Sequence, residues 1–301
     1  MKDYIIPIFK DLDIYFIQGK QKGKVPYSNS LVIGDHLIDT GISPVRLREI
    51  RKKFSINKVL FSHWHDDHIR DNKVFSDLPF YCHVDTQPII EDVDKILGLY
   101  DLRGSKAEKP FKGWLSDTIN VYNTKIEDVF QSGDIITIKD DIEVHVISTP
   151  GHSIGHCSFY IKELNFAFLA DIDLSTFGPW YGGKDSNITE FKASIEKVKK
   201  LNLETVVTGH SGLFKGEKLI KNGLKKYKSI FSKREAKILH YLSKENSKKP
   251  EDLLEKNIIY KRYFFFKSFL IAMEKTMIQK HFDELLEQNK IERKDDGFVL
   301  I

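Results

Sequence analysis

Cysteine, long apolar runs and low-complexity tracts are scarce in this 301-residue sequence. Its only cysteines are Cys82 and Cys157, and two cysteines without a spacing motif do not make a disulfide framework. Residues 1–11 contain too short an apolar run for a secretory signal and carry Asp and Pro at unsuitable places. The most apolar window, residues 263–273, is interrupted by Lys267 and has about half the length of a membrane span. We therefore expect a cytoplasmic protein that does not cross a membrane.

Charge divides the chain into two unequal parts. Residues 215–301 contain 21 Lys and Arg against 13 Asp and Glu, a net charge of +8, whereas the rest has 26 against 30, a net charge of −4. This shift predicts a boundary soon after His210, and we expect a larger domain over residues 1–231 and a smaller one over residues 232–301. The basic module is either a solvated surface or a contact for a polyanion such as RNA.

Four short apolar strands are predicted at residues 58–62, 144–148, 165–170 and 205–209. Each strand runs directly into side chains that bind metal ions well. Strand ends are rigid, so side chains placed there can converge on a point with little loss of order. The residues at these ends are His63, His65, Asp67, His68, His152, Asp171 and His210. A single histidine near a strand end is usually structural. Seven candidate ligands at four strand ends cannot be discounted one at a time, because a structural explanation would have to account for all four strands together.

The spacing assigns these residues to two metal ions. Residues two apart in an extended segment point to the same side, so His63 and His65 can bind one ion together. The chain then turns toward a short helix expected from Ile69 onward, so the next side chains can face a second ion. Imidazole and carboxylate ligands without thiolate suit Zn and also Fe or Mn. The expected ligands are His63, His65 and His152 for the first ion and Asp67, His68 and His210 for the second, with Asp171 as a bridge.

These motifs resemble those of the metallo-β-lactamase-fold hydrolases, and the glyoxalase II-like group is the most similar in style. They read His-Trp-His-Asp-Asp-His, Thr-Pro-Gly-His-Ser-Ile-Gly-His, Ala-Asp and Thr-Gly-His, in this order, over about residues 10–215. The resemblance implies an α+β fold with a four-layer αββα sandwich, two metal ions and a bridging hydroxide. It also implies that His156, four residues after His152, is a hydrogen-bonding support rather than a ligand. The commonest zinc β-lactamases of the family lack a counterpart of His68, which argues against antibiotic hydrolysis.

The charges of such a site indicate its chemistry. Two divalent cations, two carboxylates and a hydroxide leave a net charge of about +1. The metals lower the pKa of bound water toward ~7, so no Ser or Cys nucleophile is needed, and we expect Asp67 and Asp171 to be the catalytic carboxylates.

The leading expectation is hydrolysis of a thioester or ester of a small anionic molecule. The alternatives are a metal-dependent endoribonuclease or phosphodiesterase and, as a different class, a mononuclear-iron persulfide dioxygenase. A binding protein that retains only the fold is the least favoured.

Two segments between the ligands are candidates for shaping the pocket. Residues 177–183 read Phe-Gly-Pro-Trp-Tyr-Gly-Gly, and we expect Trp180 and Tyr181 to bind substrate unless both are buried in the core. Residues 86–131 are predicted to be largely helical, with a loop at residues 103–112. The remaining histidines lack the strand-end context and are expected to be structural. They are His36, His83, His145, His240 and His281.

The C-terminal module is predicted to be helical with a final hairpin. We expect a helix over residues 232–242, a short helix from Pro250, one or two helices from about Phe264 to Leu286, and a hairpin over residues 291–301 closed on Asp-Gly. This order of elements resembles a winged-helix domain. One branch of these hydrolases carries such a domain at its C-terminus, and that branch includes both thioesterase-like and endoribonuclease members. Its long apolar stripe predicts that the module docks on the catalytic domain or mediates a homodimer, and that it borders the substrate entrance.

Overall fold

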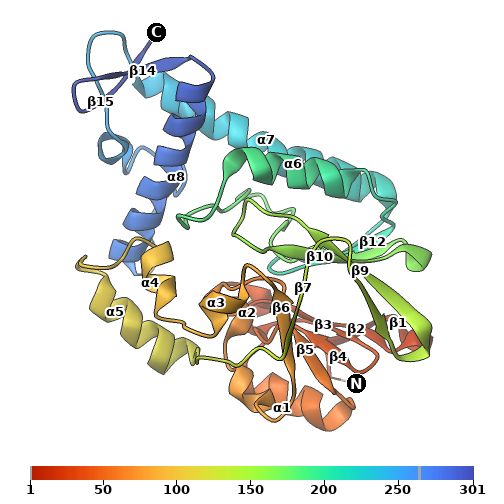
Figure 1. Cartoon of the computed structure of the whole chain (residues 1–301). Coiled ribbons are helices and arrows are strands. Elements are labelled where there is room, and N and C mark those ends of the chain that lie inside the picture. Colours follow the sequence, from red (N-terminus) through yellow and green to blue (C-terminus); the bar gives the residue numbers. More distant parts are fainter. Residues whose placement is uncertain (1, 264–265) are drawn as a thin grey trace.

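Two mixed β-sheets stack face to face, with helices on both outer faces, in the computed structural model, which describes residues 2–263 and 266–301 (Figure 1). The seven-stranded sheet contains β1 (Ile5–Phe9), β2 (Ile14–Ile17), β3 (Ser30–Ile33), β4 (His36–Ile38), β5 (Lys58–Leu60), β6 (Phe80–His83) and β7 (Asp128–Phe130), in that order. The six-stranded sheet contains β8 (Ile135–Ile138), β9 (Ile142–Ser148), β10 (Cys157–Ile161), β11 (Phe166–Phe168), β12 (Thr205–Thr208) and β13 (Gly212–Lys215). Short 3₁₀ turns are η1 (Lys10–Leu12), η2 (Lys20–Gly23), η3 (Asn72–Phe75), η5 (Lys139–Asp141) and η6 (Lys162–Leu164).

Alternation along the strands builds the layers. In β2, Ile14 and Phe16 face the core between the two sheets, whereas Tyr15 and Ile17 face the outer side. Helix α1 (Pro44–Lys53) covers that outer side, and α6 (Ile188–Lys199) and α7 (Glu217–Tyr241) cover the second sheet. The expected α+β fold with a four-layer αββα sandwich is therefore confirmed.

The predicted strands before the candidate ligands are present as β5, β9, β11 and β12. Several neighbouring strands are parallel: β4–β5, β5–β6, β6–β7 and β11–β12. The candidate ligands that follow β5 and β11 therefore lie at the edge of each sheet where the parallel strands end. The short helix after His65 begins earlier than expected, because α2 (Asp66–Ile69) ends at Ile69 instead of beginning there. Its first turn carries Asp66 and Asp67, and carboxylates are favourable at a helix N-terminus.

The segment between β6 and β7 is helical, as predicted. It forms α3 (Gln87–Ile90), α4 (Lys95–Leu99), α5 (Glu108–Gly113) and a π-helical turn, η4 (Trp114–Ile119). The loop expected at residues 103–112 is wrong in its second half, where α5 forms. Phe111 explains the difference, because it is buried and stacks on Phe269 at 4.9 Å between ring centroids.

The C-terminal region differs from the expectation at its first helix. α7 runs without a break across the predicted boundary at residue 231, so the predicted helix start at Ser232 is wrong. Apolar residues recur at helical spacing both before and after Ser232, so they form one continuous buried face of α7. The face consists of Ile220, Leu224, Tyr227, Phe231 and Ile238. The division into two domains at this point remains a prediction.

The other C-terminal elements agree with the sequence. They are η7 (Pro250–Leu253), one long helix α8 (Lys267–Glu287) and the hairpin β14 (Ile291–Lys294) and β15 (Gly297–Leu300). Phe264, where the helical run was expected to begin, lies outside the described residues. The comparison with a winged-helix domain remains a prediction.

Helix α8 docks on the catalytic part of the same chain. Its stripe Leu270, Met273, Met277, Phe282 and Leu285 is buried. Lys192 of α6 forms an ion pair with Glu284 of α8 at 2.7 Å, and Phe269 packs against Tyr100 of the inserted segment. The predicted docking is thus confirmed, and a second chain is not needed to cover the stripe. Within residues 2–263 and 266–301, no helix combines the length and apolar character needed to cross a membrane.

Candidate metal centre

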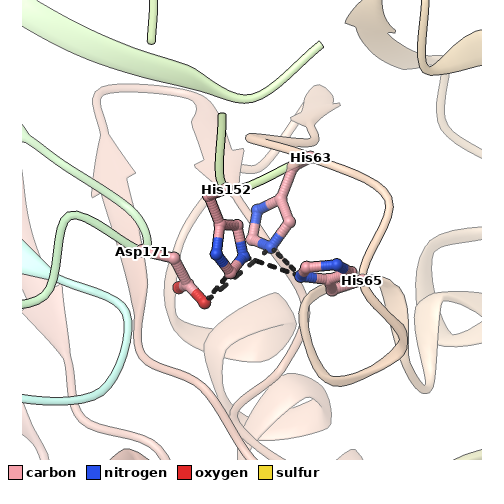
Figure 2. A group of neighbouring side chains, drawn as sticks. All are labelled: His63, His65, His152 and Asp171. Carbon is pink, nitrogen blue, oxygen red and sulfur yellow. Dashed lines mark hydrogen bonds and ion pairs between the residues drawn. The ribbon is translucent and has the colours of Figure 1, made fainter. Parts of the chain in front are cut away.

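The seven candidate ligands form two adjacent groups at the strand ends. The first group contains His63, His65, His152 and Asp171, whose side chains point toward one another (Figure 2). His65 Nδ1 lies 3.0 Å from His63 Nε2 and 2.7 Å from His152 Nε2. His152 Nε2 lies 3.2 Å from Asp171 Oδ2. The structure therefore brings these four side chains to one point, as the spacing predicts.

The second group contains Asp67, His68 and His210. His210 Nε2 lies 3.4 Å from His68 Nε2 and 3.4 Å from Asp67 Oδ2. Asp171 lies between the two groups, because its Oδ1 is 3.0 Å from His68 Nε2 and its Oδ2 is 3.4 Å from His210 Nε2. One carboxylate thus faces both groups, which is the geometry that a bridging ligand requires.

In three of the candidate histidine ligands, the ring nitrogen that points away from the centre has a fixed hydrogen-bond acceptor. That acceptor determines which ring nitrogen carries the hydrogen. His152 Nδ1 donates to the Trp180 carbonyl at 2.9 Å, and His210 Nδ1 donates to the Gly23 carbonyl at 2.6 Å. His68 Nδ1 lies 2.7 Å from the Asp39 carboxylate. Because these oxygens accept and do not donate, the Nε2 atom of each neutral ring is left with a free lone pair.

His63 is fixed in the same way through a serine. Ser62 Oγ donates its hydrogen to Asp39 Oδ2 at 2.7 Å, so it has to accept from His63 Nδ1 at 3.0 Å. Asp39 therefore orients one histidine of each group. The sequence did not single out Asp39, although the signal was present, since strand β4 runs into it as the other strands run into their ligands.

A cation can satisfy several ring nitrogens that converge on one point. The inward-facing nitrogens of His63, His65 and His152 lie 2.7 to 3.0 Å apart, and the outer acceptors of His63 and His152 leave a free lone pair on the Nε2 atom of each. Ligands of a tetrahedral zinc ion lie about 3.3 Å apart, because each is ~2.0–2.1 Å from the ion. The donor set and its spacing therefore fit a divalent metal, with hydrogen-bonded imidazoles and carboxylates as is usual for such ligands.

Electrostatics favour positive charge at the second group. Burial lowers the pKa of His210, but the carboxylates Asp171, Asp67 and Asp173 outweigh this effect and raise that pKa to about 10. In the first group, burial and then the neighbouring His68 ring hold the pKa of His63 well below its usual value. His63 is therefore neutral, as a metal ligand must be, while the second group attracts a cation.

The candidate ligands differ in their access to solvent. The side chains of His63, His68 and His152 are 0%, 0% and 2% exposed, whereas those of His210, Asp67 and Asp171 are 17%, 11% and 10% exposed. The solvent-facing edge of the centre therefore consists of His210, Asp67 and Asp171. Aromatic rings cover the first group, since Trp180 lies 5.1 Å from His65 between ring centroids and Tyr100 lies 5.9 Å from it.

The two expected substrate-binding aromatics have different positions. Trp180 is partly exposed and packs its ring against His65 and His152. Tyr181 is fully buried, and its hydroxyl is bonded to His281 Nε2 at 2.7 Å, so its aromatic ring cannot reach a substrate. Tyr181 is therefore a packing residue, and Trp180 alone remains a candidate pocket wall.

The other histidines lie outside both groups. His156 Nε2 accepts from the Asp171 backbone N–H at 3.1 Å, so it supports a candidate ligand as the resemblance implied. Two further carboxylates were not predicted: Asp173 accepts from the His210 N–H at 2.8 Å, and Asp185 accepts from Trp64 Nε1 at 2.9 Å. His36, His83, His145, His240 and His281 belong to neither candidate group.

His281 provides a pH test of the C-terminal packing. Burial and then the nearby Arg234 lower its pKa to about 3, whereas the unfolded chain binds a proton near pH 6.5. Stability from this neutral ring is thus present above pH 6.5 and is lost as the pH falls toward 3. We expect His281→Gln to weaken the acid dependence of the free energy of unfolding by up to about 1.4 kcal/mol per pH unit. Urea unfolding with a chelator at pH 7 and pH 5 measures this, and equal slopes for both proteins would contradict it.

Comparison with known protein families agrees with this geometry. The sequence model of the metallo-beta-lactamase superfamily matches residues 24–210, more than half of the chain and a range that contains all seven candidate ligands. The chain belongs to the metallo-beta-lactamase superfamily. Members of this superfamily are generally hydrolases, and the present chain is a superfamily hydrolase with a candidate metal site.

Individual relatives are distant. An uncharacterized protein of Aquifex aeolicus (strain VF5) is 26% identical over 182 residues, which cover 58% of this chain and 77% of that protein. A hydroxyacylglutathione hydrolase of Chelativorans sp. (strain BNC1) is 36% identical over 80 residues, which cover 26% of this chain and 30% of the relative. The crystal structure of a metallo-beta-lactamase family protein from Thermus thermophilus covers 99% of this chain and 97% of its own, with a TM-score of 0.69 and 17% identity. The whole-chain fold, including the C-terminal helices, is therefore shared with that structure.

Proposed function

We propose that this protein is a dinuclear metal-dependent hydrolase that acts on a thioester or ester of a small anionic molecule. The observation that carries the proposal is the convergence of imidazole and carboxylate ligand atoms in two groups that share Asp171. The short similarity to a hydroxyacylglutathione hydrolase supports the thioester class, although it spans under a third of that relative.

Each side chain has a defined part in this proposal. His63, His65 and His152 would hold one ion, Asp67, His68 and His210 the other, and Asp171 would contact both. Zn, Fe or Mn bound there would polarise the substrate carbonyl and supply a nucleophilic hydroxide at neutral pH. Asp39 keeps His63 and His68 in the tautomer that presents Nε2. Trp180 and Tyr100 exclude water from the buried first group.

Access and charge favour an anionic substrate. The exposed edge of the centre consists of His210, Asp67 and Asp171. With two divalent cations bound, the positive charge would exceed that of the two carboxylates, so the opening would attract anions. Neutral or cationic acyl compounds would lack this attraction.

A substrate panel tests the proposal against its alternatives. Protein stripped of metal and reloaded separately with Zn²⁺, Mn²⁺ or Fe²⁺ is assayed with an S-acyl thioester of an anionic thiol, an aryl ester, single-stranded RNA and a persulfide under oxygen. We expect thioester or ester hydrolysis to dominate and to disappear after chelation. Full activity in the chelated protein, or a trapped acyl-enzyme on Ser62, Ser153 or Ser211, would refute the metal mechanism. Predominant RNA cleavage, or oxygen consumption with one iron per chain, would replace it with the corresponding alternative.

A further inference from the structure

Residues 177–181 lie between the candidate metal centre and the C-terminal region. The Trp180 carbonyl accepts the hydrogen bond from His152 Nδ1 at 2.9 Å, and the Trp180 ring packs on His152 and His65. The orientation of His152 thus depends on where this segment places one carbonyl group. Nothing in the metal-binding motifs themselves fixes that position.

The C-terminal region holds this segment from three directions. Arg234 of α7 donates to the Pro179 carbonyl, to the Phe177 carbonyl at 2.8 Å and to the Tyr181 hydroxyl at 3.1 Å. Trp180 Nε1 donates to the Tyr260 hydroxyl at 2.9 Å. His281 Nε2 of α8 is hydrogen-bonded to the Tyr181 hydroxyl at 2.7 Å. The residues on both sides of the Trp180 carbonyl are therefore anchored outside residues 24–210.

Arg234 is an unusual anchor because it is buried without a counterion. It is 3% exposed, and among the described residues no carboxylate lies within ion-pair distance of it. A buried charge without a partner is costly unless its hydrogen bonds are satisfied. Here the backbone carbonyls accept these bonds, and the guanidinium lies 5.0 Å from the Phe177 ring and 5.4 Å from the Tyr181 ring, measured to the ring centroids.

Close backbone packing brings the segment within reach of α7. Gly178 has φ +87°, and a Cβ atom there would lie 2.5 Å from Ile230 Cγ2. A larger residue would force the segment away from α7 and lengthen the Arg234 hydrogen bonds. The glycine and the arginine thus act together on the same stretch of backbone.

We propose that Arg234 is a positioning residue for the first metal group, acting through residues 177–181 on His152. This inference rests on the proposed function in taking His152 as a metal ligand. Within the described part of the chain, residues 177–181 form no hydrogen bond to the side chains of the second group, Asp67, His68 and His210, so the effect is specific to one of the two ions. The C-terminal region is then part of the metal site's support rather than an independent appendage.

The test compares Arg234→Met with Lys233→Met, a change of the neighbouring exposed cation on the same helix. Zn²⁺ affinity is measured by competition with a chromophoric chelator, on protein whose folding has been checked by circular dichroism. Loss of an outer hydrogen-bonding partner typically weakens metal binding 10–100-fold. We expect a loss of about this size for one ion in Arg234→Met, unchanged binding of the other ion, and wild-type behaviour for Lys233→Met.

A second variant keeps the inference testable if Arg234→Met does not fold. Tyr260→Phe retains the ring and removes only the acceptor of Trp180 Nε1, and we expect it to weaken the same ion by a smaller factor. Two ions bound with wild-type affinity by the folded variants, whatever their melting temperatures, would overturn the positioning role and leave the hydrolase proposal intact. A wild-type protein that binds no Zn²⁺ would overturn both.

Discussion

Replacement of Asp171 with Asn is expected to lower kcat/KM on the thioester or ester about 10³-fold. Asn keeps the shape of the side chain but removes the negative charge that faces both groups. The Asp171 oxygens lie 3.0 to 3.4 Å from the Nε2 atoms of His68, His152 and His210. Metal-based stabilisation of transition-state charge contributes several kcal/mol, and ~4 kcal/mol corresponds to about 10³ in rate.

The matched control is Asp128→Asn, which changes an exposed carboxylate on β7 that belongs to neither candidate group. Steady-state kinetics and metal content are measured on both variants at saturating Zn²⁺. Asp128→Asn should behave as the wild type. More than a tenth of the wild-type kcat/KM in Asp171→Asn would show that no bridging carboxylate is needed.

Replacement of Asp39 with Asn is expected to weaken the binding of both ions by about 10–100-fold, the usual effect of losing an outer hydrogen-bonding partner. Asp39 is fully buried and accepts from His68 Nδ1 at 2.7 Å, Ser62 Oγ at 2.7 Å and Ser62 N at 2.8 Å. An amide nitrogen in place of one oxygen would face a donor instead of accepting from it. Its φ of 61° is left-handed, and Asn tolerates this backbone, so the change is confined to the hydrogen bonds.

Asp13→Asn is the matched control for backbone effects, because Asp13 also has a left-handed φ, of 51°, but is not buried and lies outside the site. Isothermal titration with Zn²⁺ should give two weakened phases for Asp39→Asn and wild-type phases for Asp13→Asn. Because Asp39 orients His68 directly and His63 through Ser62 Oγ, weakening of a single phase would contradict its shared role. That pattern also separates it from Arg234, which is expected to affect one ion only.

The candidate site was largely predictable because its residues lie at local, repeated positions. His63, His65 and His152 each follow an apolar strand, and the edge of a sheet brings such ends together whatever the loops between them do. Asp39 followed the same rule and was missed because a lone Asp is a weaker signal than a histidine cluster. Asp173 had no local signal, since its contact with the His210 N–H joins segments that are far apart in sequence.

The C-terminal region shows what local patterns cannot provide. The expected domain boundary at residue 231 falls inside α7, because a change in surface composition along a helix does not interrupt its buried face. Buried Tyr181 is hydrogen-bonded to His281, which is 100 residues away, so its local sequence could not separate a pocket aromatic from a packing aromatic. Helix α5 forms where a loop was expected, since Phe111 is buried against α8.

The central claim is that this chain binds two metal ions through seven named side chains. The most direct measurement is elemental analysis of metal-saturated protein combined with anomalous diffraction to locate each ion. We predict two ions per chain, about 3.5–4 Å apart, one among His63, His65 and His152 and the other beside Asp67, His68 and His210, with Asp171 contacting both. A single ion at saturation, with Asp67 and His210 uncoordinated, would contradict the account.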